Sequence, residues 1–250
     1  MDYYFLYIGL SILVLPALFF GIYAQIKISN AYKEAKQKPS RQGLTAKEFA
    51  RRVLDAAGMR NVAIKEVKGE LTDYYDSKNK VLALSSGNYN SSSLAALGIA
   101  AHEIGHAIQD KTGYRPLKIR HLFIKISNFF SKALIPLLLL SVAISFLLTF
   151  LYNTGWSYNS ITYLPLYIMI GLYALSCLLN LITLFVEYDA SARTRTLLID
   201  TGLLDEVEYE EVQKVLKAAA LTYVASFITS LLEFVRLLLI LISSTNRNRK

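Results

Sequence analysis

The sequence predicts an integral membrane protein that is mainly helical and carries a small α+β segment on one side of the membrane. Hydrophobic residues make up 54% of the 250 residues, and the mean hydropathy of +0.35 is too high for an ordinary soluble domain. Long uncharged stretches recur along the chain, and most basic residues lie between the first two of them. These observations together favour several transmembrane helices with one polar segment between them.

Four stretches are long and apolar enough to cross a bilayer, which takes about 20 residues of helix. They cover residues 3–24, 133–152, about 162–186 and 218–243. The last stretch contains Glu233 and Arg236, whose i,i+3 spacing places both on one helical face, where they can pair. The opening "MDYY" lacks the basic n-region of a signal peptide, so we expect the first stretch to be retained as an anchor.

The distribution of basic residues predicts the topology. Residues 25–132 hold 19 of the 27 lysines and arginines, whereas the connection "NTGWSYNS" has none. By the positive-inside rule the larger segment is cytoplasmic, in a multi-pass protein of the cell (inner or plasma) membrane. If all four stretches cross, the basic "RNRK" end lies outside, against this rule. Either the last stretch does not cross fully or the other connections outweigh the tail.

The chain therefore divides into five predicted segments. These are an anchor (1–25), a cytoplasmic segment with the candidate chemistry (26–128), a transmembrane hairpin (129–186), further cytoplasmic helices (187–217), and a membrane helix with a basic tail (218–250).

The cytoplasmic segment is expected to contain a helix, two strands and a second helix. A capping box at Thr45 and Glu48 predicts a short amphipathic helix that ends at Gly58. The stretches "VAIKEV" and "KVLALS" alternate as strands do, over residues 62–67 and 80–85. After the turn residues "SSGNYNSSS", a helix is expected to run from near Ser93 to about Asp110.

This last helix carries the most informative motif, "AHEIGHAIQD". Residues four apart lie on one helical face, so His102 and His106 have a spacing suited to two ligands of one Zn²⁺. Glu103 can accept a proton from a water molecule that the metal activates for attack on a carbonyl group. Gly105 would let another element approach closely, or it serves packing alone. Shuffling this composition would produce such a motif in roughly one or two sequences per thousand, so coincidence is a poor explanation.

A catalytic zinc site generally has a third protein ligand. The remaining histidine, His121, lies among basic residues and not at the metzincin spacing, which favours a role at the membrane surface or behind the ligands. Carboxylates are offered by "FVEYDASARTRTLL", on the predicted cytoplasmic side. Glu187 and Asp189 would point in different directions on a helix. We prefer Glu187, which shares a face with Ser191 and Arg195, and keep Asp189 as the alternative.

The chain resembles the YugP-like membrane zinc metallopeptidases of bacteria over nearly its whole length. The segments that carry the resemblance are, in order, "GLTAKEFARRVLDAAGM", "LTDYYDSKNKVLALSSGNY", "SLAALGIAAHEIGHAIQ", "VEYDAS" and "LTYVASFITSLLEFVRLL". It implies a small gluzincin-like zinc peptidase unit with His102, His106 and Glu187 as zinc ligands and Glu103 as general base. Many gluzincins carry an aspartate four residues after the ligand glutamate, where this chain has Ser191. This departure leaves open which groups support the ligands.

The resemblance also implies a cradle for the substrate. In gluzincins an edge strand lies antiparallel to the bound peptide. In this chain the candidate strand is either such an edge strand or a simple core strand, and the two alternatives have equal weight. The candidate strand consists of Val81, Leu82, Ala83 and Leu84. The polar groups that could support the ligands or stabilise an oxyanion are Ser191, Arg195, Asp189, Tyr188 and Tyr74.

We therefore expect a membrane-bound zinc endopeptidase that hydrolyses peptide bonds by attack of zinc-activated water. Its expected partners are a peptide or membrane-protein substrate and the lipid bilayer, and no nucleic acid, because no nucleic-acid-binding motif accompanies the basic residues. A non-catalytic zinc-binding scaffold is the alternative, although such a scaffold has no need of Glu103. A metal transporter is disfavoured, because the histidines precede the later spans and Glu233 is the only clearly intramembrane acid.

Overall fold

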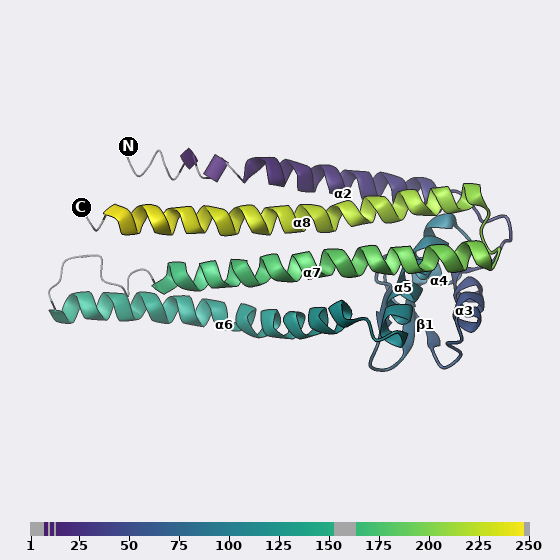
Figure 1. Cartoon of the computed structure of the whole chain (residues 1–250), viewed down its shortest axis with the longest axis horizontal. Helices are drawn as coiled ribbons and strands as arrows, with labels where there is room; N and C mark the ends of the chain where they lie inside the picture. Colours follow the sequence, from purple (N-terminus) through teal and green to yellow (C-terminus); the bar gives the residue numbers. More distant parts are fainter. Residues whose placement is uncertain (1–7, 10, 13, 153–163, 248–250) are drawn as a thin grey trace. The chain divides into compact units, whose positions relative to one another are not determined.

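The computed structural model describes residues 8–9, 11–12, 14–152 and 164–247. It is mainly helical with one small three-stranded sheet, which confirms the predicted mixed and mainly helical class (Figure 1). The helices are α2 (Leu15–Lys36), α3 (Ala46–Ala56), α4 (Ser86–Tyr89), α5 (Leu94–Lys111), α6 (Arg115–Tyr152), α7 (Leu164–Asp200) and α8 (Glu206–Arg247). The strands are β1 (Ala63–Val67), β2 (Tyr74–Asp76) and β3 (Val81–Ser85).

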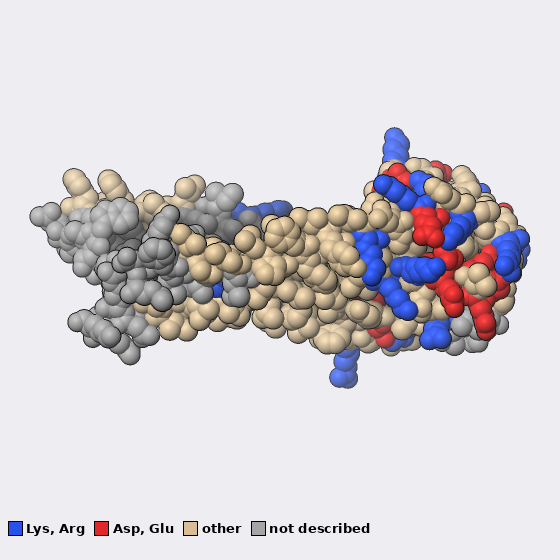
Figure 2. Space-filling view, turned by 90° about the horizontal axis from the view of Figure 1, so that it is seen from above, with Lys and Arg blue, Asp and Glu red and all other residues tan. Residues whose placement is uncertain are grey.

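The chain forms two compact units. The first, here called the helical unit, comprises residues 1–20, 119–182 and 225–250. The second, here called the mixed unit, comprises residues 21–118 and 183–224. The mixed unit holds the sheet, α3, α4, α5 and every residue of the predicted zinc site. Figure 2 shows charged side chains gathered over this unit, whereas long tan surfaces elsewhere carry few charges.

Two helices in the described part of the chain are long and apolar enough to span a membrane, Leu166–Arg195 and Glu206–Ser243. Of their most apolar windows, 0% and 17% are buried, so they differ from the core helices of a soluble protein. The expectation of four spans is thereby corrected to two candidates. The first predicted stretch begins in residues outside the described part, and residues 133–152 lie in α6, several of whose side chains are also outside it.

The predicted ion pair in the last apolar stretch is present. Arg236 Nε donates a hydrogen bond to Glu233 Oε2 at 2.9 Å, and Arg236 Nη2 lies 2.8 Å from the same oxygen. Arg236 Nη1 also donates to Ser11 Oγ at 3.4 Å. The pairing neutralises two charges within an apolar helix, where an unpaired charge would be costly.

The helices of the mixed unit start where local sequence places them. Glu48 N donates to Thr45 Oγ1 at 3.4 Å and Thr45 N donates to Glu48 Oε2 at 3.0 Å, which completes the predicted capping box of α3. Ser93 caps α5 by accepting a hydrogen bond from the amide of Ala96. The core between these helices and the sheet consists largely of fully buried side chains, among them Phe49, Val53, Leu54, Leu82, Leu84, Leu97 and Ile104.

Of the two alternatives for Val81–Leu84, an exposed edge strand or a core strand, the structure shows the core strand. The sheet order is β1-β3-β2, with β3 parallel to β1 and antiparallel to β2. Both sides of β3 are therefore paired, and Leu82, Ala83 and Leu84 are buried. The physical reason is in its own sequence, because a nearly continuous apolar run suits a central strand buried on both faces.

The edge strand β2 was not predicted from the sequence, because it lies in the polar segment "TDYYDSKN". The side chain of Asp76, the last residue of β2, stabilises the turn between β2 and β3. Its Oδ1 accepts hydrogen bonds from the amides of Lys78 at 2.9 Å and Asn79 at 3.0 Å. This turn folds the tyrosines of β2 back against β3.

Candidate metal centre

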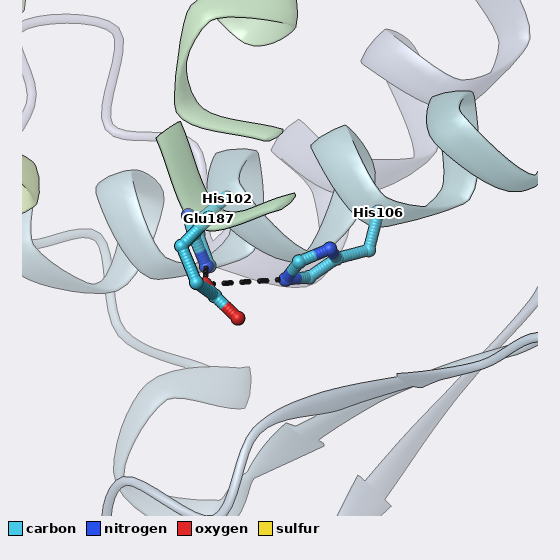
Figure 3. A group of neighbouring side chains, drawn as sticks. All are labelled: His102, His106 and Glu187. Carbon is cyan, nitrogen blue, oxygen red and sulfur yellow. Dashed lines mark hydrogen bonds and ion pairs between the residues drawn. The ribbon is translucent and has the colours of Figure 1, made fainter. Parts of the chain in front are cut away.

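Two histidines of α5 and one glutamate of α7 meet in the mixed unit (Figure 3). His102 Nε2 lies 2.9 Å from Glu187 Oε2, and His106 Nε2 lies 3.5 Å from the same oxygen. One potential ligand atom from each of the three residues lies within 4.8 Å of the others. In the described residues this is the one group of three or more such side chains that could hold a metal ion. The two imidazole rings are nearly perpendicular, at 82°.

The site suits a small divalent cation. The side chain of Glu187 is only 3% exposed, and a buried carboxylate requires a positive partner. Burial by itself lowers the pKa of His106, but the hydrogen bond and charge of Glu187, together with the charge of Glu103 and the hydrogen bond to Gln109, raise that pKa. Two imidazole nitrogens and one carboxylate oxygen, with a fourth position left for water, are a typical donor set for catalytic Zn²⁺.

Gln109 fixes the orientation and tautomer of His106. Its Nε2 donates to the Val186 carbonyl at 2.7 Å and to Asp189 Oδ2 at 2.8 Å. Its Oε1 is left as an acceptor 3.0 Å from His106 Nδ1, so the imidazole must donate there. In the neutral imidazole the lone pair then lies on Nε2, the atom that faces Glu187.

Ser191 supports the other histidine. Its Oγ lies 3.1 Å from His102 Nδ1, so the hydroxyl oxygen can accept a hydrogen bond from Nδ1–H, which leaves the lone pair of the ring on Nε2. Ser191 is therefore one of the groups that support the ligands, which the resemblance alone had left undecided. Ser191 of α7 thus contacts Nδ1 of His102, and Gln109 of α5 contacts Nδ1 of His106. Both rings present Nε2 to the carboxylate of Glu187.

Asp189, the alternative ligand, has a different environment. Its Oδ2 accepts hydrogen bonds from Gln109 and, at 2.5 Å, from Arg193 Nε. It therefore holds Gln109 in place and is not in the ligand group.

The candidates for stabilising an oxyanion lie in other surroundings. The guanidinium of Arg195 lies over the ring of Tyr209, with its carbon 5.8 Å from the ring centroid. The other two oxyanion candidates, Tyr188 and Tyr74, are exposed.

Gly105 allows the third ligand to reach the first two. A Cβ built on this residue would lie 2.2 Å from the carbonyl oxygen of Ala190 in α7, far inside van der Waals contact. The backbones of α5 and α7 thus approach each other at a glycine and an alanine, neither of which has a bulky side chain. Ala190 is fully buried in this contact. Of the two interpretations of Gly105 from sequence, the close approach of another element is confirmed.

Glu103 is partly buried beside the first ligand. Removal from water raises the pKa of its carboxyl; the nearby imidazoles of His102 and His106 oppose this rise, and the charges of Glu187 and Asp73 add to it. No hydrogen bond joins its carboxylate to another described residue, so it is free to bind water.

Two residues of the site were missed from sequence, Gln109 and Asp73. The carboxylate of Asp73 accepts hydrogen bonds from the amide and hydroxyl of Ser85 and from Asn88 Nδ2, all at 2.8–2.9 Å. It thereby joins the residue before β2 to the end of β3, and its charge acts on the carboxyl of Glu103. Gln109 carried a usable signal, because it follows His106 by three positions and shares its helical face.

Replacing Gln109 by alanine is expected to weaken zinc binding by about 10- to 100-fold, the usual effect of losing a group that orients a ligand. The substitution frees the His106 ring to rotate and leaves the Val186 carbonyl without its donor. Competition with a chromophoric chelator would measure the zinc affinity. Gln213→Ala is the matched control, because within the described residues the side chain of that glutamine bonds to Tyr209 alone, away from the ligand group. Equal affinities for Gln109→Ala and wild type would contradict the role.

Comparisons with known proteins identify the family of the chain. Residues 10–242 match the family described as "Putative neutral zinc metallopeptidase". The chain is 34% identical over 236 residues to "Putative membrane protease YugP" of Bacillus subtilis (strain 168), covering 94% of this chain and 98% of that protein. No solved structure matches. Since the family match extends over most of the chain, we conclude that the protein belongs to this family of neutral zinc metallopeptidases.

Proposed function

We propose that the protein is a membrane-bound zinc endopeptidase. The observation that carries this proposal is the convergence of His102, His106 and Glu187 within 4.8 Å, with the carboxylate of Glu103, which bonds to no other described side chain, next to the first ligand. A zinc site that only stabilised the fold would have four protein ligands and no need of a free acid at its side. Membership of a metallopeptidase family supports the same conclusion.

His102, His106 and Glu187 would hold the zinc ion. When bound, zinc supplies Lewis acidity, which lowers the pKa of water and polarises a carbonyl oxygen. Glu103 would accept the proton of the attacking water and then deliver it to the amine that leaves when the peptide bond breaks. Ser191 and Gln109 would keep both imidazoles in the tautomer that leaves Nε2 free.

We further propose that the substrate binds along β2. In the described residues this strand pairs on one side only, with β3, so its other edge is free to hydrogen-bond an extended peptide. Asp73, which directly precedes β2, is close enough to influence the pKa of Glu103 electrostatically. A peptide paired with β2 would therefore lie near the base.

The protein is proposed to be a multi-pass membrane protein with this site on the cytoplasmic side. The two candidate spans support membrane association, and the charge asymmetry of the sequence supports the orientation. Substrates would then be membrane proteins or their juxtamembrane segments, with the bilayer as the other partner. No nucleic-acid partner is proposed.

Removal of the metal tests the proposal. Full-length protein purified in detergent is expected to contain about one zinc ion per chain and to cleave an unstructured reporter protein. A chelator should lower the cleavage rate at least about 100-fold, and added Zn²⁺ should restore it. Metal analysis and gel-based cleavage rates measure both quantities. Full zinc occupancy without cleavage of soluble or membrane-anchored reporters would favour the scaffold, and protein without zinc affinity would refute the site.

A further inference from the structure

A second feature of the mixed unit lies apart from the zinc ligands. A cavity of about 510 Å³ is lined by side chains of α2 and of the first half of α8, among them Tyr23, Lys27, Glu34, Glu211 and Lys217. This volume is within the range of small-molecule sites, which runs from about 300 to 1,000 Å³. None of the groups described at the candidate metal centre lines it.

The charge of the cavity favours an anion. Lys38 Nζ lies 2.6 Å from both Glu34 Oε1 and Glu211 Oε2, and Lys214 also pairs with Glu211 at 2.6 Å. The two acids are thus already neutralised. Lys27 and Lys217 have no carboxylate partner in the part of the chain that the structure describes, so the lining keeps a net positive charge.

These two lysines also mark where each helix changes from apolar to charged. Lys27 is the first charged residue of α2, after an uncharged run from Leu15 to Ile26. Lys217 is the last charged residue of α8 before the uncharged run 218–232. Both transitions meet at one cavity. Lysines in this position extend their charged ends toward the interface of a membrane with water.

Exposed apolar side chains of α2 line the cavity at Tyr23 and Ile26 and continue to Ile22, one turn before Ile26. Ile22, Tyr23 and Ile26 of α2 are each more than half exposed, at 51%, 53% and 55%. The Nζ of Lys27 lies 5.7 Å from the centre of the Tyr23 ring, which holds the ammonium beside this apolar strip. A ligand with an anionic head and an apolar tail matches both parts.

We propose that this cavity binds the headgroup of an anionic glycerophospholipid, with its phosphate between Lys27 and Lys217. Its acyl chains would cover Ile22, Tyr23 and Ile26. The inference rests on the membrane location proposed above, but not on the peptidase activity. The bound lipid would tie α2 to α8 at the level where both become charged.

Native mass spectrometry of the full-length protein in detergent tests the proposal, with phosphatidylglycerol and phosphatidylcholine as probes. Wild type should retain phosphatidylglycerol in preference to phosphatidylcholine. Because each basic residue at a lipid interface is worth about 1 kcal/mol, the double variant Lys27→Gln/Lys217→Gln should bind phosphatidylglycerol about 30-fold more weakly. The control Lys65→Gln/Lys68→Gln removes the same charge from exposed positions of the same unit and should bind like wild type.

Each outcome separates the sources of binding. Equal loss in the control variant would assign the effect to net charge, and equal retention of both lipids would refute a headgroup site. Binding of inorganic phosphate by wild type, with no retention of phosphatidylglycerol, would reduce the site to one for the free ion and overturn the lipid assignment. Glu103→Gln protein should bind phosphatidylglycerol like wild type, so failure of the peptidase proposal leaves this result unchanged. Failure of wild type to float with phosphatidylcholine vesicles would instead refute the membrane location.

Discussion

Replacing Glu103 by glutamine is expected to abolish peptide cleavage while zinc remains bound. Glutamine has nearly the same shape as glutamate but cannot accept a proton at neutral pH. General base catalysis contributes about 10²- to 10⁴-fold, so the cleavage rate should fall by roughly 1,000-fold. Glu103 is not in the ligand group, so zinc content should stay at the wild-type value. Parallel measurements of zinc and of reporter cleavage on the same preparation would check both statements.

Glu66→Gln is the matched control for this experiment. Glu66 is an exposed glutamate of β1, and its replacement makes the same change in charge without touching the site. It should cleave the reporter as wild type does. A zinc-loaded Glu103→Gln protein with near wild-type activity would show that another group serves as the base. Activity lost equally in both variants would point to net charge instead.

Replacing Gly105 by alanine is expected to remove both zinc and activity, although the added group is a single methyl. The new Cβ would lie 2.2 Å from the Ala190 carbonyl oxygen, which belongs to the backbone and has no rotamer to change. Relief requires α7 to move by roughly 1 Å, and overpacking of this kind costs about 1–3 kcal/mol. Metal–ligand distances tolerate only about 0.2 Å, so the displaced Glu187 should lower zinc affinity at least about 100-fold. Chelator competition and thermal unfolding would measure the two effects.

Gly171→Ala provides the comparison, because Gly171 lies within α7 and a Cβ there would meet nothing within 4 Å. That variant should keep its zinc and its unfolding temperature. If Gly105→Ala bound zinc as tightly as wild type, α7 would have room to move without carrying Glu187 away. The close packing of α5 and α7 would then not be what holds the third ligand in place.

Features that depend on neighbours in the chain could be predicted from sequence. The capping box of Thr45 and Glu48, the start of α5 at Ser93 and the pairing of Glu233 with Arg236 all involve residues at most four positions apart. Helical geometry alone places such groups together. The same geometry puts His102 and His106 on one face, so two of the three candidate ligands could be predicted from sequence alone.

Strand placement was less predictable. Alternation identified two of the three strands, but the order β1-β3-β2 depends on a hairpin in which polar β2 returns beside β3. A short apolar run is compatible with either an edge or a central position, since pairing is decided by elements elsewhere in the chain. The sequence therefore left Val81–Leu84 open between an edge strand and a core strand.

The sequence by itself determined that the protein is mainly helical, rich in membrane-compatible segments and equipped with two metal-binding imidazoles and an adjacent acid. Only the tertiary structure decided which carboxylate joins them, because Glu187 and Asp189 differ by two positions but lie on different faces of α7. It also decided that Gln109 and Ser191 hold the rings from behind. These contacts depend on how closely α5 and α7 pack at Gly105, and packing between segments more than 80 residues apart is not encoded in any local pattern.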